Sequence, residues 1–188
     1  MEIVKRRTHY SLPQILLHWV SALVILWTLS SGFYVAMANV LPETKALIGY
    51  INVSLTALFI PVFVVRVYFF FTHKISHRSD SDRWAVYAAW LVHVALYVVT
   101  AIVLATGVLM MKRDIDVFGW VSLTQPITDP YWTQWFEDIH IFSCMLLSVL
   151  VALHIAAVIK HEFHGTRVLR RMWPRRSSGV RINLCEGD

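Results

Sequence analysis

The stretch FEDIHIFSCMLLSVLVALHIAAVIKH, from Phe136 to His161, decides the fold of this chain. It is almost uninterruptedly apolar, and it is long enough to cross a bilayer as a helix, which takes about 20 residues. It carries two histidines, His140 and His154, fourteen positions apart. That separation is close to four helical turns, so both lie within roughly 40° of one face and about 21 Å apart along the axis. The stretch predicts a membrane-spanning helix with one imidazole near each end.

The two histidines of this helix suggest a metal centre. Ionisable residues inside a membrane are costly and usually face the interior of the helix bundle. Imidazole is a common axial ligand of haem iron, so this helix could help to hold one haem near each membrane face. The alternative is that each histidine is a hydrogen-bonded core residue. Two imidazoles on one face at opposite depths favour at least one ligand.

The composition is that of an integral membrane protein. Of the 188 residues, 57% are hydrophobic and 15% are charged, which is far from the average of soluble domains. We predict an all-α, four-helix membrane bundle in one domain, residues 1–188, with helices at about 13–37, 46–72, 84–111 and 136–161 and a basic tail at 164–188. The basic residues lie mostly in the flanks rather than on a soluble fold, so nucleic-acid binding is not expected. Cys144 and Cys185 lack metal-site spacing.

Basic residues near the helix ends predict the orientation of the chain. Thirteen Lys and Arg lie on the side that holds both termini, and three lie on the other. The thirteen are Lys5, Arg6, Arg7, Lys74, Arg78, Arg83, Lys160, Arg167, Arg170, Arg171, Arg175, Arg176 and Arg181, and the three are Lys45, Lys112 and Arg113. Cytoplasmic loops carry the excess of Lys and Arg, so both termini should be cytoplasmic.

This orientation sets the depth of each polar side chain. His18 enters the first helix from the cytoplasm, and His154 leaves the fourth helix toward it, so the two could clamp one iron near the inner face. His140 should lie near the outer face, as should Asn52, early in the second helix. A neutral amide is a poor ligand for haem iron. The pattern therefore predicts an inner haem site and leaves an outer site open.

Short fragments along the whole chain resemble the bacterial cytochrome b561 family, whose members are four-helix inner-membrane cytochromes. The fragments are LHW at 17–19, VVR at 64–66, HVALY at 93–97, KHEF at 160–163 and LRRMWPRR at 169–176. Each fragment is weak alone, but their order along the chain is specific. The resemblance implies a multi-pass protein of the bacterial inner membrane, in contact with lipid, that binds b-type haem.

The resemblance also implies which residues hold the haem. One haem would lie between His18 and His154, and a second between His140 and a histidine of the second helix. The family's spacing puts the second-helix ligand at Asn52, so the second haem is in question. The outer site could be empty, hold a five-coordinate haem on His140, or use a methionine near that depth: Met37, Met110 or Met111.

Two further side chains are candidates for the site. Arg66 could pair with a haem propionate, because Arg makes strong bonds to carboxylates; the alternative is snorkelling to the interface. His93 could contact the inner haem or a quinone; the alternative is a hydrogen-bonded core histidine.

The resemblance implies electron transfer between the quinone pool and a periplasmic or membrane redox partner, with ubiquinone as a candidate ligand. Two alternatives stay open. Some family members oxidise superoxide and pass the electrons to ubiquinone. The chain could also be a non-enzymatic membrane subunit with a reduced haem complement.

Overall fold

Four long helices make up most of this protein. The computed structural model describes residues 11–72 and 83–163, with α1 at Leu12–Met37, α2 at Pro42–Thr72, α3 at Arg83–Leu109 and α4 at Pro130–Phe163. All four are long and apolar enough to cross a membrane, which confirms the predicted four-helix membrane fold. The predicted basic tail at 164–188 lies outside the described residues.

Two helices begin earlier than the apolar pattern predicts. α2 begins at Pro42 rather than at 46, and α4 begins at Pro130 rather than at 136. Proline suits the first helical position, because its fixed φ is already helical and it has no N–H to leave unpaired. Asp129 caps α4: its Oδ1 accepts a hydrogen bond from the backbone N–H of Tyr131 at 2.8 Å. The added residues of α4, 130–135, are rich in aromatic side chains, so they are not counted as part of the apolar run.

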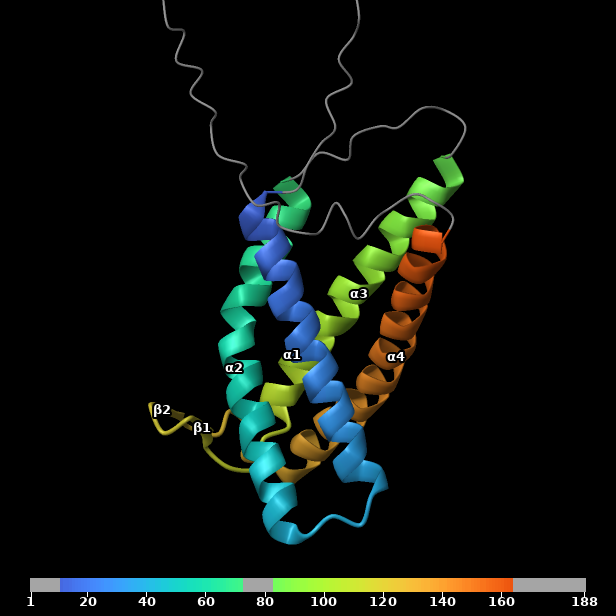
Figure 1. Cartoon of the computed structure of the whole chain (residues 1–188). Coiled ribbons are helices and arrows are strands. Elements are labelled where there is room, and N and C mark those ends of the chain that lie inside the picture. The colour runs from blue at the N-terminus through green and yellow to red at the C-terminus, as the bar shows by residue number, and fades with distance from the viewer. Residues whose placement is uncertain (1–10, 73–82, 164–188) are drawn as a thin grey trace, which may run out of the picture.

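The helices associate mainly as two pairs. α1 packs along α2, α3 packs along α4, and a lighter contact joins α2 to α3. Figure 1 shows the start of α1 and the end of α4 at one end of the bundle, which we call the terminal end. The opposite end, with the α1–α2 connection and a small β-hairpin, is the hairpin end. The halves of the bundle next to these two ends are called the terminal half and the hairpin half. Side chains of the α1–α2 pair can therefore meet side chains of the α3–α4 pair in the space between the two pairs.

The connection between α3 and α4 contains a β-hairpin that the sequence did not predict. β1 (Ile115–Val117) pairs antiparallel with β2 (Val121–Leu123). The turn places Phe118 at φ 50° and Gly119 at φ 73°. Successive positive φ values are the signature of the type I′ hairpin turn, in which glycine is favoured.

The hairpin is fixed to α2. Ser54 is fully buried; its hydroxyl donates to the carbonyl oxygen of Asp116 at 3.1 Å and accepts from the backbone N–H of Phe118 at 3.2 Å. Beside it, an apolar cluster joins hairpin and helix ends, formed by Met111, Ile115 and Val117 packed against Val53, Ala57, Val108 and Phe118. The hairpin therefore covers one side of α2 at the hairpin end.

Candidate functional site

The terminal half of the bundle brings together four polar side chains, one from each helix. They are His18 of α1, Arg66 of α2, His93 of α3 and His154 of α4. Arg66 bonds to His18 of α1 and to Tyr97 of α3, and the His93 ring of α3 contacts the His154 ring of α4, so side chains from both helix pairs converge. These are four of the five residues that the sequence nominated.

Arg66 holds His18. Its Nη2 lies 2.9 Å from His18 Nδ1, and its Nε donates to the Tyr97 hydroxyl at 3.1 Å. Its guanidinium carbon also lies 5.4 Å from the centroid of the Tyr97 ring. Arginine has no acceptor, so Nδ1 of His18 accepts this bond and the ring proton sits on Nε2. Arg66 is half-buried and directed into the bundle rather than extended to the interface.

His93 and His154 form the other half of the site. Their ring centroids lie 5.2 Å apart, with the planes at 85°. Nδ1 of His93 lies 2.6 Å from the carbonyl oxygen of Ala89, one turn earlier in α3. A carbonyl only accepts, so Nδ1 carries the proton and Nε2 of His93 keeps a lone pair. His93 thus presents a base next to the His154 ring.

This donor set fits a haem. Imidazoles from opposite helix pairs can supply two axial ligands, and a guanidinium is the natural partner of a propionate carboxylate. Aromatic rings lie beside these polar side chains: the ring centroids of Phe63 and Phe70 are 6.0 and 4.6 Å from that of Tyr97. The residues present could therefore bind, orient and desolvate the group.

His140 lies apart from this site, in the hairpin half, and packs on α3. Its Nδ1 lies 3.1 Å from the carbonyl oxygen of Val103 and 3.2 Å from Thr106 Oγ1. Its Nε2 lies 3.5 Å from Cys144 Sγ. Gly107 makes this approach feasible, because a Cβ there would lie 3.1 Å from His140 Cε1. Both ring nitrogens of His140 therefore have partners within the α3–α4 pair.

Asn52 lies on the other helix pair and bonds to α1. Its Oδ1 accepts from Trp27 Nε1 at 3.1 Å and from Ser31 Oγ at 3.0 Å. The sequence analysis did not identify this cluster. The available signal was the spacing of Trp27 and Ser31, which puts two donors four residues apart on one helical face.

The three methionines near the hairpin ends of the helices occupy other environments. Met37 is 85% exposed at the end of α1. Met111 belongs to the apolar cluster under the hairpin. Met110 follows the end of α3, and its backbone N–H bonds to the carbonyl of Thr106. These positions are those of lipid-facing and packing residues.

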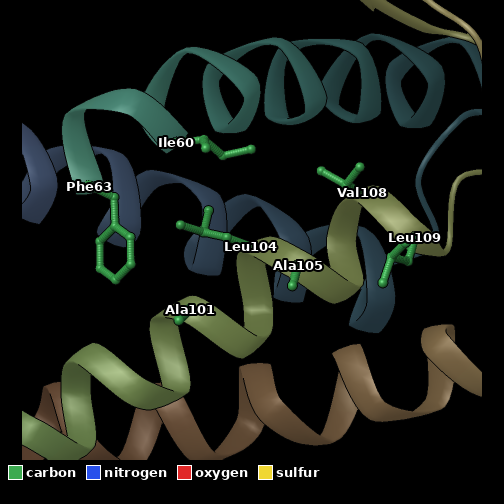
Figure 2. Close-up of a pocket in the computed structure, with 7 residues that line it drawn as sticks. All are labelled: Ile60, Phe63, Ala101, Leu104, Ala105, Val108 and Leu109. Carbon is green, nitrogen blue, oxygen red and sulfur yellow. The ribbon is translucent and has the colours of Figure 1, made fainter. Parts of the chain in front are cut away.

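A cavity of about 430 Å³ lies between α2 and α3. Figure 2 shows its lining, which is wholly apolar: Ile60, Phe63, Ala101, Leu104, Ala105, Val108 and Leu109. It has no side chain that could ligate a metal or bind a charged group, so it suits hydrocarbon. Phe63 also packs beside Tyr97, so this apolar cavity adjoins the polar site of the terminal half without sharing its polar side chains.

Comparison with known proteins identifies the family of this chain. No curated protein matches the chain. The family model for prokaryotic cytochrome b561 matches residues 9–175, which include all four helices and every residue of the site. The chain therefore belongs to the prokaryotic cytochrome b561 family, as a multi-pass protein of the bacterial inner membrane that binds b-type haem and transfers electrons.

Proposed function

We propose that this protein carries electrons between the quinone pool and a redox partner, through a haem held by His18 and His154. The observation that supports the proposal is the convergence of four polar side chains, one from each helix, in the terminal half: Arg66 joins His18 to Tyr97 of α3, and His93 of α3 contacts His154. With His18 and His154 both as ligands, the haem would supply electron transfer rather than oxygen binding. The haem supplies a centre that accepts and releases one electron at a time.

Arg66 has two roles in this proposal. With Nδ1 of His18 accepting from Arg66, the His18 ring proton lies on Nε2. If Nε2 of His18 ligated the iron, the ring proton would lie on Nδ1, and Nδ1 could no longer accept from Arg66. The guanidinium would then be available to a haem propionate, while its Nε could still donate to the Tyr97 hydroxyl. Arg66 would thus orient the His18 ring when no haem is bound and hold a propionate when the haem is present.

His93 fits the quinone part of the proposal. A quinol gives up protons as well as electrons when it is oxidised. Nε2 of His93 is an available base, and its ring stands edge-on to His154. A quinol that approaches the terminal half would find in Nε2 of His93 an acceptor for one of its protons.

The proposal is tested by replacing His154 and comparing a histidine of the same helix. His154→Ala should abolish the haem absorbance, whereas His161→Ala, exposed in the last turn of α4, should retain it. His154→Met keeps a ligand and should raise the reduction potential, because His/Met ligation favours the reduced iron. An unchanged spectrum in His154→Ala would overturn the ligand assignment.

The quinone step has its own test. The purified protein should be reduced by a ubiquinol analogue under anaerobic conditions. His93→Ala should slow that reduction while leaving haem content and reduction by dithionite unchanged. Equal rates of reduction by the ubiquinol analogue with and without His93 would show that His93 is not the proton acceptor.

A further inference from the structure

We infer that this chain holds a single haem, in the terminal half, and that its electrons enter and leave from that half. The inference rests on the proposed function, because it takes the terminal site as the one that is filled. A second haem, which the family resemblance implies, would need an axial ligand from α2 in the hairpin half. The hairpin half does not fit that group.

Asn52, at the α2 position where the family has its ligand, already accepts two hydrogen bonds from α1. A carbonyl oxygen has two lone pairs, and Oδ1 of Asn52 receives two donors, Trp27 Nε1 and Ser31 Oγ. Both donors belong to α1, so these bonds join α2 to α1. The amide is neutral, a poor ligand for iron, and without a free lone pair.

The neighbouring positions of α2 face the hairpin. Ser54 binds the hairpin backbone on both sides of its turn, and Val53 and Ala57 pack against the apolar cluster beneath it. α2 contains no histidine, methionine or cysteine, and the ring of Tyr50 packs edge-on against that of Phe118 in the hairpin turn. This helix therefore offers no common haem ligand in the hairpin half.

The remaining ligand of the hairpin half has partners as well. Among residues 11–72 and 83–163, His140 is the only histidine in that half. Its Nδ1 donates toward the carbonyl oxygen of Val103, and its Nε2 accepts from the Cys144 thiol. A thiol is a weak donor, so Nε2 alone would not exclude a metal. What is missing is a second ligand opposite it.

A single haem restricts where redox partners can act. His140 and His154 are about 21 Å apart along α4, so a haem beside His154 lies far from the hairpin end. Electron donor and acceptor must both reach the terminal half, which the basic flanks predict to be cytoplasmic. Superoxide oxidation at the opposite face would lack a nearby haem.

Haem stoichiometry tests the inference directly. The pyridine haemochrome assay should give about one haem per polypeptide, and a redox titration should show one single-electron transition. His140→Gln, whose amide can still donate to Val103, should retain the full absorbance, and so should His140→Ala. A ratio near two, or loss of absorbance in both His140 variants, would overturn the single-haem inference alone. A protein that binds no haem would instead overturn the proposed function.

Sidedness supplies an independent test. Dithionite, which does not cross sealed membranes readily, should reduce the haem much faster from one side in right-side-out and inverted vesicles. The faster side should be the one on which a protease removes a C-terminal tag. Equal rates from both sides would contradict the inference.

Discussion

Replacing Asn52 by alanine separates a structural role from a ligand role. The substitution removes the acceptor of two hydrogen bonds between α1 and α2, at 3.1 Å from Trp27 and 3.0 Å from Ser31. Hydrogen bonds between membrane helices average about 0.6 kcal/mol in double-mutant cycles. Two of them sum to about 1 kcal/mol, with an upper limit of about 3 kcal/mol if each reaches the value found in soluble proteins.

The two donors should not contribute equally. Ser31 Oγ also lies 3.4 Å from the carbonyl oxygen of Thr28, so its hydroxyl keeps an acceptor when the amide is removed. No second acceptor of the Trp27 indole N–H occurs among the described contacts. Trp27→Phe, which keeps the ring and removes the donor, should therefore cost more than Ser31→Ala.

The assay is equilibrium unfolding in mixed micelles, followed by circular dichroism, with haem content measured on the same samples. Asn39→Ala is the matched control, because it removes the same side chain from the exposed α1–α2 connection. Asn52→Ala should lower the free energy of unfolding by about 1 kcal/mol relative to that control and leave haem content unchanged. Loss of haem, or a stability equal to that of the control, would refute the reasoning.

Three other substitutions test the remaining contacts. Ser54→Ala removes both hairpin bonds and should speed amide exchange in residues 115–123 by about tenfold, for a loss of about 1.4 kcal/mol; Ser122→Ala, exposed on β2, should not. Gly107→Val adds side-chain atoms next to His140, where even a Cβ would lie 3.1 Å from Cε1, and should cost about 1–3 kcal/mol of stability by overpacking; an unchanged unfolding midpoint would contradict this. Arg66→Gln should lower the midpoint potential of the haem, because the positive charge of Arg66 favours the reduced iron, which is less positive than the oxidised iron. An interaction of about 1.4 kcal/mol corresponds to a shift of about 60 mV in a one-electron titration. A raised potential would be evidence against the charge effect.

Much of this molecule follows from local properties of the chain. The number of spans depends on the length of each apolar run, and a helix fixes the rise and rotation per residue. Those two facts alone put His18 and His154 at one end of the bundle and His140 toward the other. They also assign Arg66 to the same end as His18, because the second helix runs back across the membrane.

Other features required the helices to be packed together. The bond between Arg66 and His18 joins residues 48 positions apart, and the bonds of Asn52 to α1 depend on how the two helices are rotated. The docking of the hairpin on Ser54 joins residues more than 60 positions apart. Helical periodicity predicts how deep a side chain lies and on which face of its helix. Which face of a helix contacts each neighbouring helix depends on the packing of all four helices. That is why the position of Asn52 could be read along the chain, whereas its role as a bridge to α1 emerged from the packed structure.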